Sequence, residues 1–439
     1  MKNKKLAFVS AAMLTLSMAG TFINPVSASS ETNLNVVYWP GPESDAFQQV
    51  VNRYNATQGL KDHIHVNLLL FSRVGTYTKE DSMMSSKSSA ADLWYAASYN
   101  IGQYSAYMNP LPGKINKSLF IPSAVKSLTV NGKWYVLPMD VSNHFLFYRK
   151  DLIHKLLTDS AWKKEYAQIS KQVVGKALQP KQPSQWSWND FMATAAFFTQ
   201  SKNPSSPTQY GTFMQMENLI YNVMIWDDVL WSYGGNWLKP NGTPAFDTKA
   251  AKEALQLYQN IYKDGFTPSS SSTSEYPQTN AALETGNAAF AIQWSAAYSE
   301  LTDKSKDQFY NEIGVAPVPG GKTHIHAMGV AINKYSTHQA QDVKFLKYLA
   351  STSAMKQYAI AGGIPPVESV LNSLSKQDAE FPLISKTVKE NVFSEPPLKQ
   401  EQNVLQVLAQ DLSGAWANQT SVQQALSQAQ SDVANVIGK

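Results

Sequence analysis

Near the middle of the 439-residue chain runs the sequence Tyr233-Gly-Gly-Asn-Trp-Leu-Lys-Pro-Asn-Gly-Thr-Pro-Ala-Phe-Asp247. Its Gly-Gly pair predicts a turn, and the residues after it predict a short loop of the hairpin type. The following residues, 254–265, have helical periodicity and end on a glycine, which predicts a helix that stops at Gly265. A chain of this length exceeds what one hydrophobic core usually supports, so we expect two lobes.

The N-terminal part of the chain alternates predicted strands with a helix. Residues 34–39 have a strand pattern that breaks at Pro40-Gly-Pro42, where we expect a loop. Residues 44–55 have apolar side chains at helical spacing, and residues 63–70 and 90–96 are two further predicted strands. Strand, helix, strand order indicates parallel pairing, so the sequence predicts an α/β lobe.

Short sequences recur along the chain in the order found in one known family. They include Tyr148-Arg-Lys-Asp-Leu152 after a strand, Trp186-Ser-Trp-Asn-Asp-Phe191 at a helix start and Gly286-Asn-Ala-Ala-Phe-Ala-Ile-Gln-Trp294. With residues 233–265, this series resembles the extracytoplasmic solute-binding proteins of ABC importers. The similarity is to the maltose-binding-like branch that binds sugars and oligosaccharides. No one of these sequences is diagnostic, but their ordered series is.

The resemblance implies an α/β, two-lobed periplasmic-binding-protein fold with two or three hinge crossings. Lobe 1 would comprise residues 30–140 and 324–352, and lobe 2 residues 144–320 and 355–439. It further implies that a sugar or oligosaccharide is captured between the lobes and delivered to the membrane permease subunits of an ABC importer. A monomer that performs no catalysis and needs no cofactor or metal is expected.

Composition favours a neutral ligand. Arg53, Arg73 and Arg149 are the only arginines, whereas phosphate and carboxylate ligands usually call for arginine forks. The chain has 11 tryptophans and 21 tyrosines, whose flat faces and polar edges suit sugar rings. Removal of residues 1–28, which carry three lysines and no acidic residue, lowers the formal net charge from +4 to +1. This near-neutral balance argues against nucleic acid as a partner.

The N-terminus has the features of an export signal. Lys2, Lys4 and Lys5 precede the apolar run of residues 6–23, and Val26-Ser-Ala28 fits a cleavage site. A membrane helix is the alternative, but the flanking residues favour a signal peptide over residues 1–28. The chain has no cysteine, which excludes disulfides and a lipid-anchored cysteine. We expect an exported protein, periplasmic or extracellular.

Catalytic and metal motifs are weak. The sequence has no Gly-x-Ser-x-Gly and no His-Glu-x-x-His, and Gly320-Gly-Lys-Thr323 lacks the opening glycine of a phosphate loop, because position 316 is Ala316. The pairs His63/His65 and His324/His326 would need further ligands to hold a metal, so structural histidines are expected there.

Two other functions stay open. An exported carbohydrate-active hydrolase would use paired carboxylates, and the candidates are Glu43, Asp140, Asp227 and Asp228. A sugar-binding cleft needs the same residue types, because carboxylates accept hydrogen bonds from hydroxyls. A binding protein for another neutral solute would share the fold.

The candidate ligand contacts lie at strand ends, at the predicted lobe crossing and where the family resemblance places the cleft. They are Trp39, Glu43, Arg73, Tyr99, Asn100, Asp140, Asn143, Trp226, Asp227, Trp294 and Gly363. Trp39 follows a strand at the edge where open α/β sheets bind ligands, and Trp294 matches the family's stacking tryptophan. Structural alternatives are core packing for the tryptophans, a helix-start carboxylate for Glu43, a salt bridge for Arg73 and a turn for Gly363.

Overall fold

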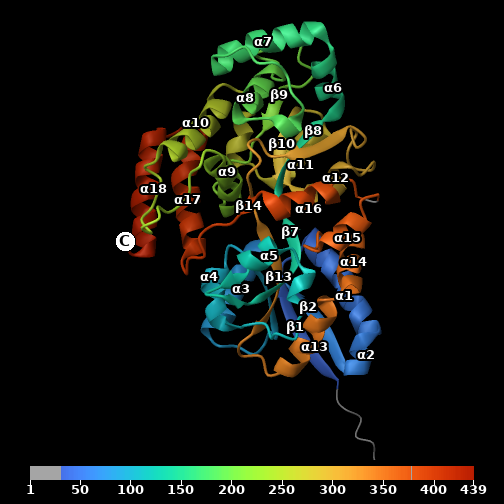
Figure 1. Ribbon diagram of the computed structural model, residues 1–439. Helices are drawn as coiled ribbons and strands as arrows, with labels where there is room; N and C mark the ends of the chain where they lie inside the picture. The colour runs from blue at the N-terminus through green and yellow to red at the C-terminus, as the bar shows by residue number, and fades with distance from the viewer. Residues whose placement is uncertain (1–30, 377) are drawn as a thin grey trace, which may run out of the picture.

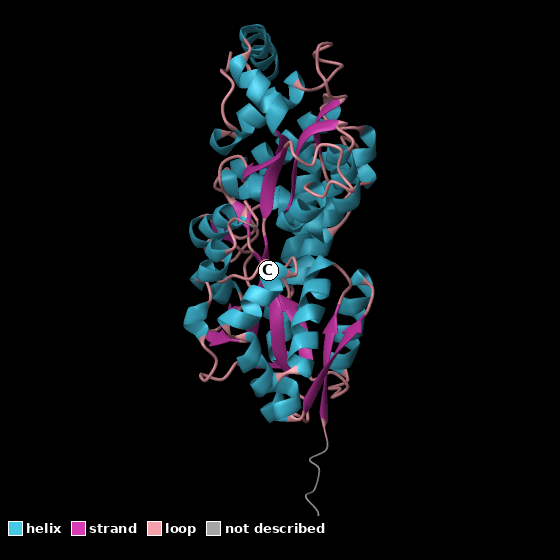
Figure 2. Cartoon of the chain, turned by 90° about the vertical axis from the view of Figure 1, so that its right-hand side faces the viewer, coloured by secondary structure: helices cyan, strands magenta, loops and turns pink. Residues whose placement is uncertain are grey.

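The computed structural model describes residues 31–376 and 378–439, so the predicted signal peptide at residues 1–28 lies outside the described residues. Each of two lobes is built on one β-sheet, and Figures 1 and 2 show the lobes stacked along the long axis of the molecule. The predicted two-lobed α/β fold is confirmed. Among the residues that the structure describes, no helix is both long and apolar enough to cross a bilayer.

The first lobe contains a six-stranded sheet in the order β2-β1-β3-β13-β4, with β7 also paired to β13. Its strands are β1 (Thr32–Tyr38), β2 (Ile64–Leu70), β3 (Leu93–Ala97), β4 (Met108–Asn109), β7 (Val136–Ser142) and β13 (His326–Asn333). The predicted parallel pairing holds for β1 with β2 and β3. By contrast, β13 runs antiparallel to both β3 and β7.

The second lobe contains a four-stranded sheet in the order β11-β8-β10-β9. Its strands are β8 (His144–Arg149), β9 (Tyr210–Phe213), β10 (Ala288–Trp294) and β11 (Ile313–Pro317). Every residue of β10 is buried, as expected of a strand covered on both faces. Two short strand pairs complete the structure: β5 (Thr129–Val130) with β6 (Lys133–Trp134), and β12 (Thr323–His324) with β14 (Val392–Phe393).

Helices cover both sheets (Figure 1). Those before the first crossing are α1 (Pro42–Ala56), α2 (Gln58–Asp62), α3 (Arg73–Ser85), α4 (Ile101–Tyr104) and α5 (Pro122–Ser127). Those of the second lobe's long segment are α6 (Lys150–Thr158), α7 (Ser160–Val174), α8 (Trp188–Phe197), α9 (Ile220–Ser232), α10 (Lys249–Lys263), α11 (Tyr276–Glu284) and α12 (Tyr298–Leu301). The remaining ones are α13 (Gln339–Leu349), α14 (Thr352–Ile360), α15 (Glu368–Ser373), α16 (Phe381–Glu390), α17 (Glu401–Trp416) and α18 (Val422–Ile437).

The segment 233–265 folds as its sequence predicts. Gly234 has a positive φ of 80° at the turn, and Leu238 and Pro244 form an isolated antiparallel bridge that closes the short loop. Helix α10 then ends at Lys263, and Gly265 takes a left-handed φ of 73°. Glycine adopts that region without a Cβ clash, which explains why the helix stops there.

The chain crosses between the lobes at three places. It passes from β7 to β8 through Asn143 and returns from β11 to β13 through β12. Helix α14 packs against α1, whereas α17 packs against α9 and α10, so a third crossing lies between α14 and α17. The lobe boundary predicted at residues 352–355 falls inside α14. Side-by-side crossings of this kind are the geometry of a hinge.

Candidate functional site

A small cavity of about 60 Å³ lies between the lobes, at the ends of β1, β7 and β10 and the start of β13. Trp39 and Glu43 line it from the first lobe, and Trp294 and Tyr276 line it from the second. Both indoles are nearly buried, with Trp39 3% and Trp294 6% exposed. The structure therefore brings three of the predicted contacts, Trp39, Glu43 and Trp294, to one place.

Trp294 is held by imidazole rings. Its ring centroid lies 4.1 Å from that of His144 and 5.1 Å from that of His326, both in edge-on geometry. Ser142 and His326 also line the cavity, from the crossing strands β7 and β13. Packing against both imidazole rings restricts the orientation of the indole, which is what a stacking platform for a ligand requires.

Three tyrosines join the lobes beside the cavity. The Tyr77 hydroxyl, on α3, is hydrogen-bonded to the Tyr99 hydroxyl and lies 3.1 Å from the hydroxyl of Tyr221, on α9. The Tyr77 ring is 6.0 Å from that of Trp39, and the Tyr221 ring is 6.4 Å from that of Trp294. Predicted contact Tyr99 therefore belongs to the aromatic cluster that extends from the cavity wall.

Asp140 is buried and has partners within the protein. Its Oδ2 accepts hydrogen bonds from the Tyr358 hydroxyl at 2.8 Å and from the backbone N–H of Ile364 at 2.7 Å. Burial, and then the negative charge of Glu43, raise the pKa of Asp140 well above its usual range. Asp140 does not line the cavity, so its role as a ligand contact stays a prediction.

The two predicted asparagines support the backbone. Asn143 donates from Nδ2 to the carbonyl of His324 at 2.7 Å, which ties the outgoing crossing to the returning one. Asn100 accepts at Oδ1 from the backbone N–H of Ala97 at 3.0 Å, at the end of β3. Both side chains are buried, and neither lines the cavity.

Trp226 and Asp227 lie on α9 and are fully buried. Both carboxylate oxygens of Asp227 lie within hydrogen-bond distance of Trp237 Nε1, at 2.9 and 3.0 Å. Burial, and next the charge of Glu395, raise the pKa of Asp227 well above its usual range. Trp237 comes from the stretch 233–247, so this contact anchors that stretch to α9 and does not face the cavity.

The last two predicted contacts are Gly363 and Arg73. A Cβ on Gly363 would overlap the ring of Tyr358, so close side-chain packing accounts for this glycine. Arg73 is the first residue of α3, but its side chain lies outside the described part of the structure. Each stays a prediction as a ligand contact.

Buried histidine–carboxylate pairs lie at the crossings. His144 Nδ1 is 2.8 Å from Asp228 Oδ2, and Asp228 Oδ1 accepts from the backbone N–H of His324 at 2.8 Å. His324 Nδ1 is in turn 2.8 Å from Glu395 Oε1. Within residues 31–376 and 378–439, no group of three or more histidine or acidic side chains has a geometry suited to a metal. The two histidine–carboxylate pairs hold together β8, α9, β12 and the segment after β14.

Sequence reasoning missed several residues around the cavity. They are Tyr77, Ser142, Tyr221, Tyr276 and His326. Tyr77 and Tyr221 lie on helices, where an aromatic residue is usually core, and no local signal separates them from other tyrosines. His326 and Ser142 could have been found, because both lie at the predicted lobe crossings.

The family model for bacterial extracellular solute-binding proteins matches residues 40–356. The chain belongs to this family. A probable amino-acid ABC transporter periplasmic-binding protein of Sinorhizobium fredii is 22% identical over 227 residues, which are 51% of this chain and 52% of that protein. A mannitol-binding protein of Pseudomonas aeruginosa is 23% identical over 266 residues, 59% of this chain and 55% of that protein. The chain thus matches about half the length of these curated relatives.

Solved structures of the same architecture extend over nearly the whole chain. Maltose-bound MalE3 of T. maritima has a TM-score of 0.77 at 20% identity, covering 92% of this chain and 99% of that one. A solute-binding protein of Agrobacterium vitis with bound D-mannitol has a TM-score of 0.73 at 20% identity, covering 91% and 97%. At this identity the similarity establishes the fold.

Proposed function

We propose that this protein captures a sugar, oligosaccharide or sugar alcohol between its lobes and delivers it to the membrane permease of an ABC importer. The observation that carries the proposal is that Trp39 and Trp294, from opposite lobes, line the same cavity. Indole faces stack on the apolar faces of sugar rings, and Glu43 supplies a carboxylate that can accept hydrogen bonds from hydroxyls. The maltose and D-mannitol in related structures support this class of ligand.

The charge of the cavity favours a neutral ligand over an amino acid. Among the described residues that line it, none is lysine or arginine, so no cation is available to bind a ligand carboxylate. This matters because one relative is named as a probable amino-acid binder. The absence of a cation among these described lining residues favours a neutral solute.

Binding without catalysis is part of the proposal. Glycosidases use two carboxyl groups on either side of the bond that breaks, and Glu43 is the only carboxylate among the described residues lining the cavity. Asp140, Asp227 and Asp228 have partners within the protein. We also propose that residues 1–28 direct export and are removed, and that the mature protein acts as a monomer.

Thermal-shift and calorimetric titration of the mature chain test this function. Maltose, longer malto-oligosaccharides, D-mannitol and ribitol are the sugar and polyol ligands, and glycine and glutamate are the amino-acid comparators. A bound sugar should stabilise the protein by about 2.7 kcal/mol at a hundredfold its Kd. Stabilisation by the amino acids alone, or release of hydrolysed sugar, would overturn the proposal.

A further inference from the structure

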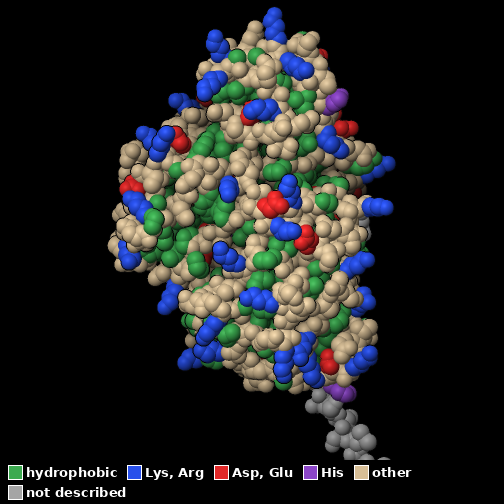
Figure 3. All heavy atoms as spheres, viewed as in Figure 1, with side chains coloured by type: hydrophobic (Ala, Val, Ile, Leu, Met, Phe, Trp, Pro, Cys, Tyr) green, Lys and Arg blue, Asp and Glu red, His purple; other side chains and the backbone are tan. Residues whose placement is uncertain are grey.

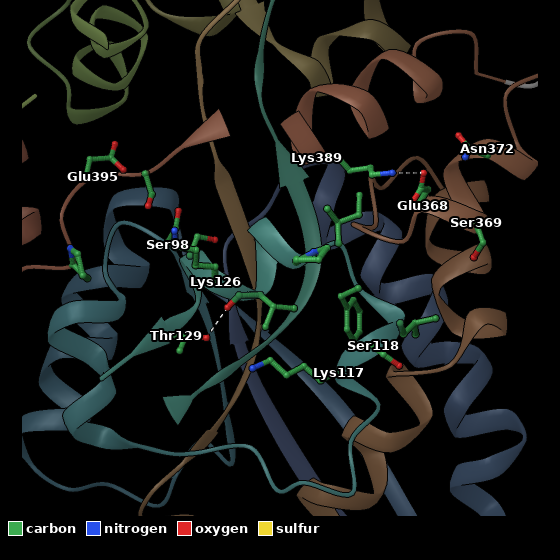
Figure 4. A pocket seen from close by; sticks show the side chains of 18 residues that line it. Ser98, Lys117, Ser118, Lys126, Thr129, Glu368, Ser369, Asn372, Lys389 and Glu395 are labelled. Atoms are coloured by element: carbon green, nitrogen blue, oxygen red, sulfur yellow. Dashed lines mark hydrogen bonds and ion pairs between the residues drawn. The ribbon is translucent and has the colours of Figure 1, made fainter. Parts of the chain in front are cut away.

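A second cavity of the described structure is an open groove of about 1,240 Å³ at the hinge (Figure 4). One wall is formed by residues 117–129, which include the short 3-10 helix η2 (Lys117–Leu119) and α5. The opposite wall comes from α15, the end of α16 and the segment after β14. The groove shares no lining residue with the aromatic cavity, so it is a separate feature of the hinge.

The inner surface of the groove is apolar. Phe120, Ile121 and Val125 are each at most 4% exposed, and they line it together with Leu119 and Pro397. Backbone and side-chain hydrogen bonds hold this wall in place: the Ile121 N–H donates to the Pro366 carbonyl at 2.8 Å. A concave, apolar and supported surface of this size is typical of a small-molecule site.

The rim of the groove carries unbalanced positive charge. Three lysines and two glutamates line it, and Lys389 is paired with Glu368 at 2.9 Å. Glu395 lies on the opposite side, 2.8 Å from His324. Lys117 and Lys126 have no acidic partner within 4.0 Å among the described residues. Figure 4 shows Lys117 next to Ser118, and Lys126 near Ser98 and Thr129.

Figure 3 shows lysine and arginine side chains scattered over the face of Figure 1, with no broad basic patch. A groove with two unpaired cations beside an apolar surface is complementary to a ligand with one negative group and one apolar chain. An uncharged lipid would leave the cations unused, and a cationic amphiphile would be repelled by them.

We propose that the groove binds an amphipathic carboxylate of the medium-chain fatty-acid class. Its carboxylate would lie at Lys126, and its chain would lie along Leu119, Pro122 and Pro397, the apolar lining residues that are exposed or partly exposed. The concave shape favours such a small molecule over an extended partner surface. This site is additional to the sugar site and does not depend on it.

Calorimetric titration of the mature chain with decanoate, below its micelle-forming concentration, tests the proposal. One decanoate per chain should bind, and 1-decanol and decylammonium should bind at least tenfold more weakly. Absence of decanoate binding up to millimolar concentration, or equal binding of 1-decanol, would overturn the proposed chemistry.

Substitutions locate the site. Lys126→Gln should weaken decanoate binding at least fivefold, whereas Lys133→Gln, at an exposed lysine of β6 outside the groove, should leave it unchanged. Ser369→Trp places bulk on the exposed opposite wall and should also weaken binding. Equal weakening by Lys126→Gln and Lys133→Gln would mean that only the net charge of the protein matters, which contradicts a specific site. Normal binding by both Lys126→Gln and Ser369→Trp would mean that the ligand binds outside the groove. Melting temperatures confirm that each variant is folded.

Discussion

The hydroxyl of Tyr77 lies 3.1 Å from the hydroxyl of Tyr221, although the two residues are 144 positions apart in the chain and belong to different lobes. Tyr77 also contacts the hydroxyl of Tyr99, so three phenols form a chain of hydrogen bonds from one lobe to the other. Burial, and then the neighbouring tyrosines, raise the pKa of Tyr77 well above its usual range, so this hydroxyl stays neutral and able to donate. Because Tyr77 and Tyr221 belong to different lobes, separation of the lobes would break this contact.

Tyr221→Phe should weaken ligand affinity because it removes this interlobe hydrogen bond while retaining the ring. A net hydrogen bond contributes about 1 kcal/mol, so the Kd of the sugar should rise roughly fivefold. Calorimetry measures the Kd. Tyr233→Phe, at the exposed end of the same helix, is the matched control and should bind normally. Unchanged affinity for Tyr221→Phe would show that this contact does not favour the closed state.

Trp294→Phe should reduce sugar affinity because a smaller ring gives less stacking area. Trp294→Ala should cost more, on the order of 1–3 kcal/mol of binding free energy. Since Trp294 packs on His144 and His326, the alanine variant will also be less stable, and both variants need melting curves. Trp226→Phe, a buried indole outside the cavity, is the control for general fold effects. Normal affinity in folded Trp294→Ala would contradict the stacking role.

Asp140→Asn should be tolerated better than Asp140→Leu. The raised pKa of Asp140 favours its neutral form, which asparagine resembles, and an amide oxygen can still accept from Tyr358 and Ile364. Leucine leaves both donors buried without a partner, at a cost of about 1–3 kcal/mol for each. Urea unfolding compares the free energies. If both variants lose only sugar affinity and keep full stability, Asp140 is a ligand contact after all.

Asp342 should make stability depend on pH. Burial raises its pKa from 3.8 to about 8, and the Asp92 charge adds to this, while a hydrogen bond with Ser336 opposes it. The Ser336 hydroxyl lies 2.7 Å from Asp342 and 3.0 Å from Asp92, and His338 is 2.9 Å from Asp92. One hydroxyl proton cannot serve both carboxylates, so a protonated Asp342 completes the network.

The sign follows from proton counting. Between pH 4 and pH 8 the folded state retains a proton that the unfolded state has lost, so the free energy of unfolding falls as the pH rises, by up to about 1.4 kcal/mol per pH unit. Asp342→Asn should flatten this dependence, as measured by urea unfolding at pH 5, 6, 7 and 8. Asp45→Asn, at an exposed position on α1, should not. An identical pH profile for Asp342→Asn and the parent protein would contradict the assignment.

The fold can be predicted well from the sequence because its short-range sequence patterns agree with the elements that the structure contains. Alternating strand and helix patterns, the glycines at 234 and 265, and the order of short family sequences all point to the two-lobed architecture. The Ser187 side chain caps α8 by accepting from the N–H of Asp190, and the Asp190 side chain accepts from the N–H of Ser187. Such contacts span only three residues, so they can be inferred from sequence.

The candidate site is predicted less completely because its contacts are long-range. Trp39 and Trp294 end strands, and strand ends face the cleft. Asp140 also lies at a crossing, but its partner Tyr358 is 218 residues away, and the sequence around Asp140 gives no indication of that contact. The contact of Asp227 with Trp237 spans only ten residues, but no local sequence pattern predicts it either. Tyr276 lies at the start of α11 in a proline-containing segment, where sequence alone gives no reason to expect a cavity wall.

Ligand binding should change the distance between the lobes. A cavity of about 60 Å³ is far smaller than the roughly 300–1,000 Å³ of typical ligand pockets, so a sugar can enter only when the lobes separate. Without ligand, the interlobe contacts would be few compared with the cores of the lobes, and open states should be populated.

Small-angle scattering of the mature chain tests this. The radius of gyration should fall when the sugar is added, while circular dichroism stays unchanged, because the lobes move as rigid bodies about three side-by-side crossings. Tyr221→Phe, which lacks the interlobe hydrogen bond, should need a higher sugar concentration for the same decrease. A sugar that binds by calorimetry but leaves the scattering curve unchanged would show that the lobes do not close on it.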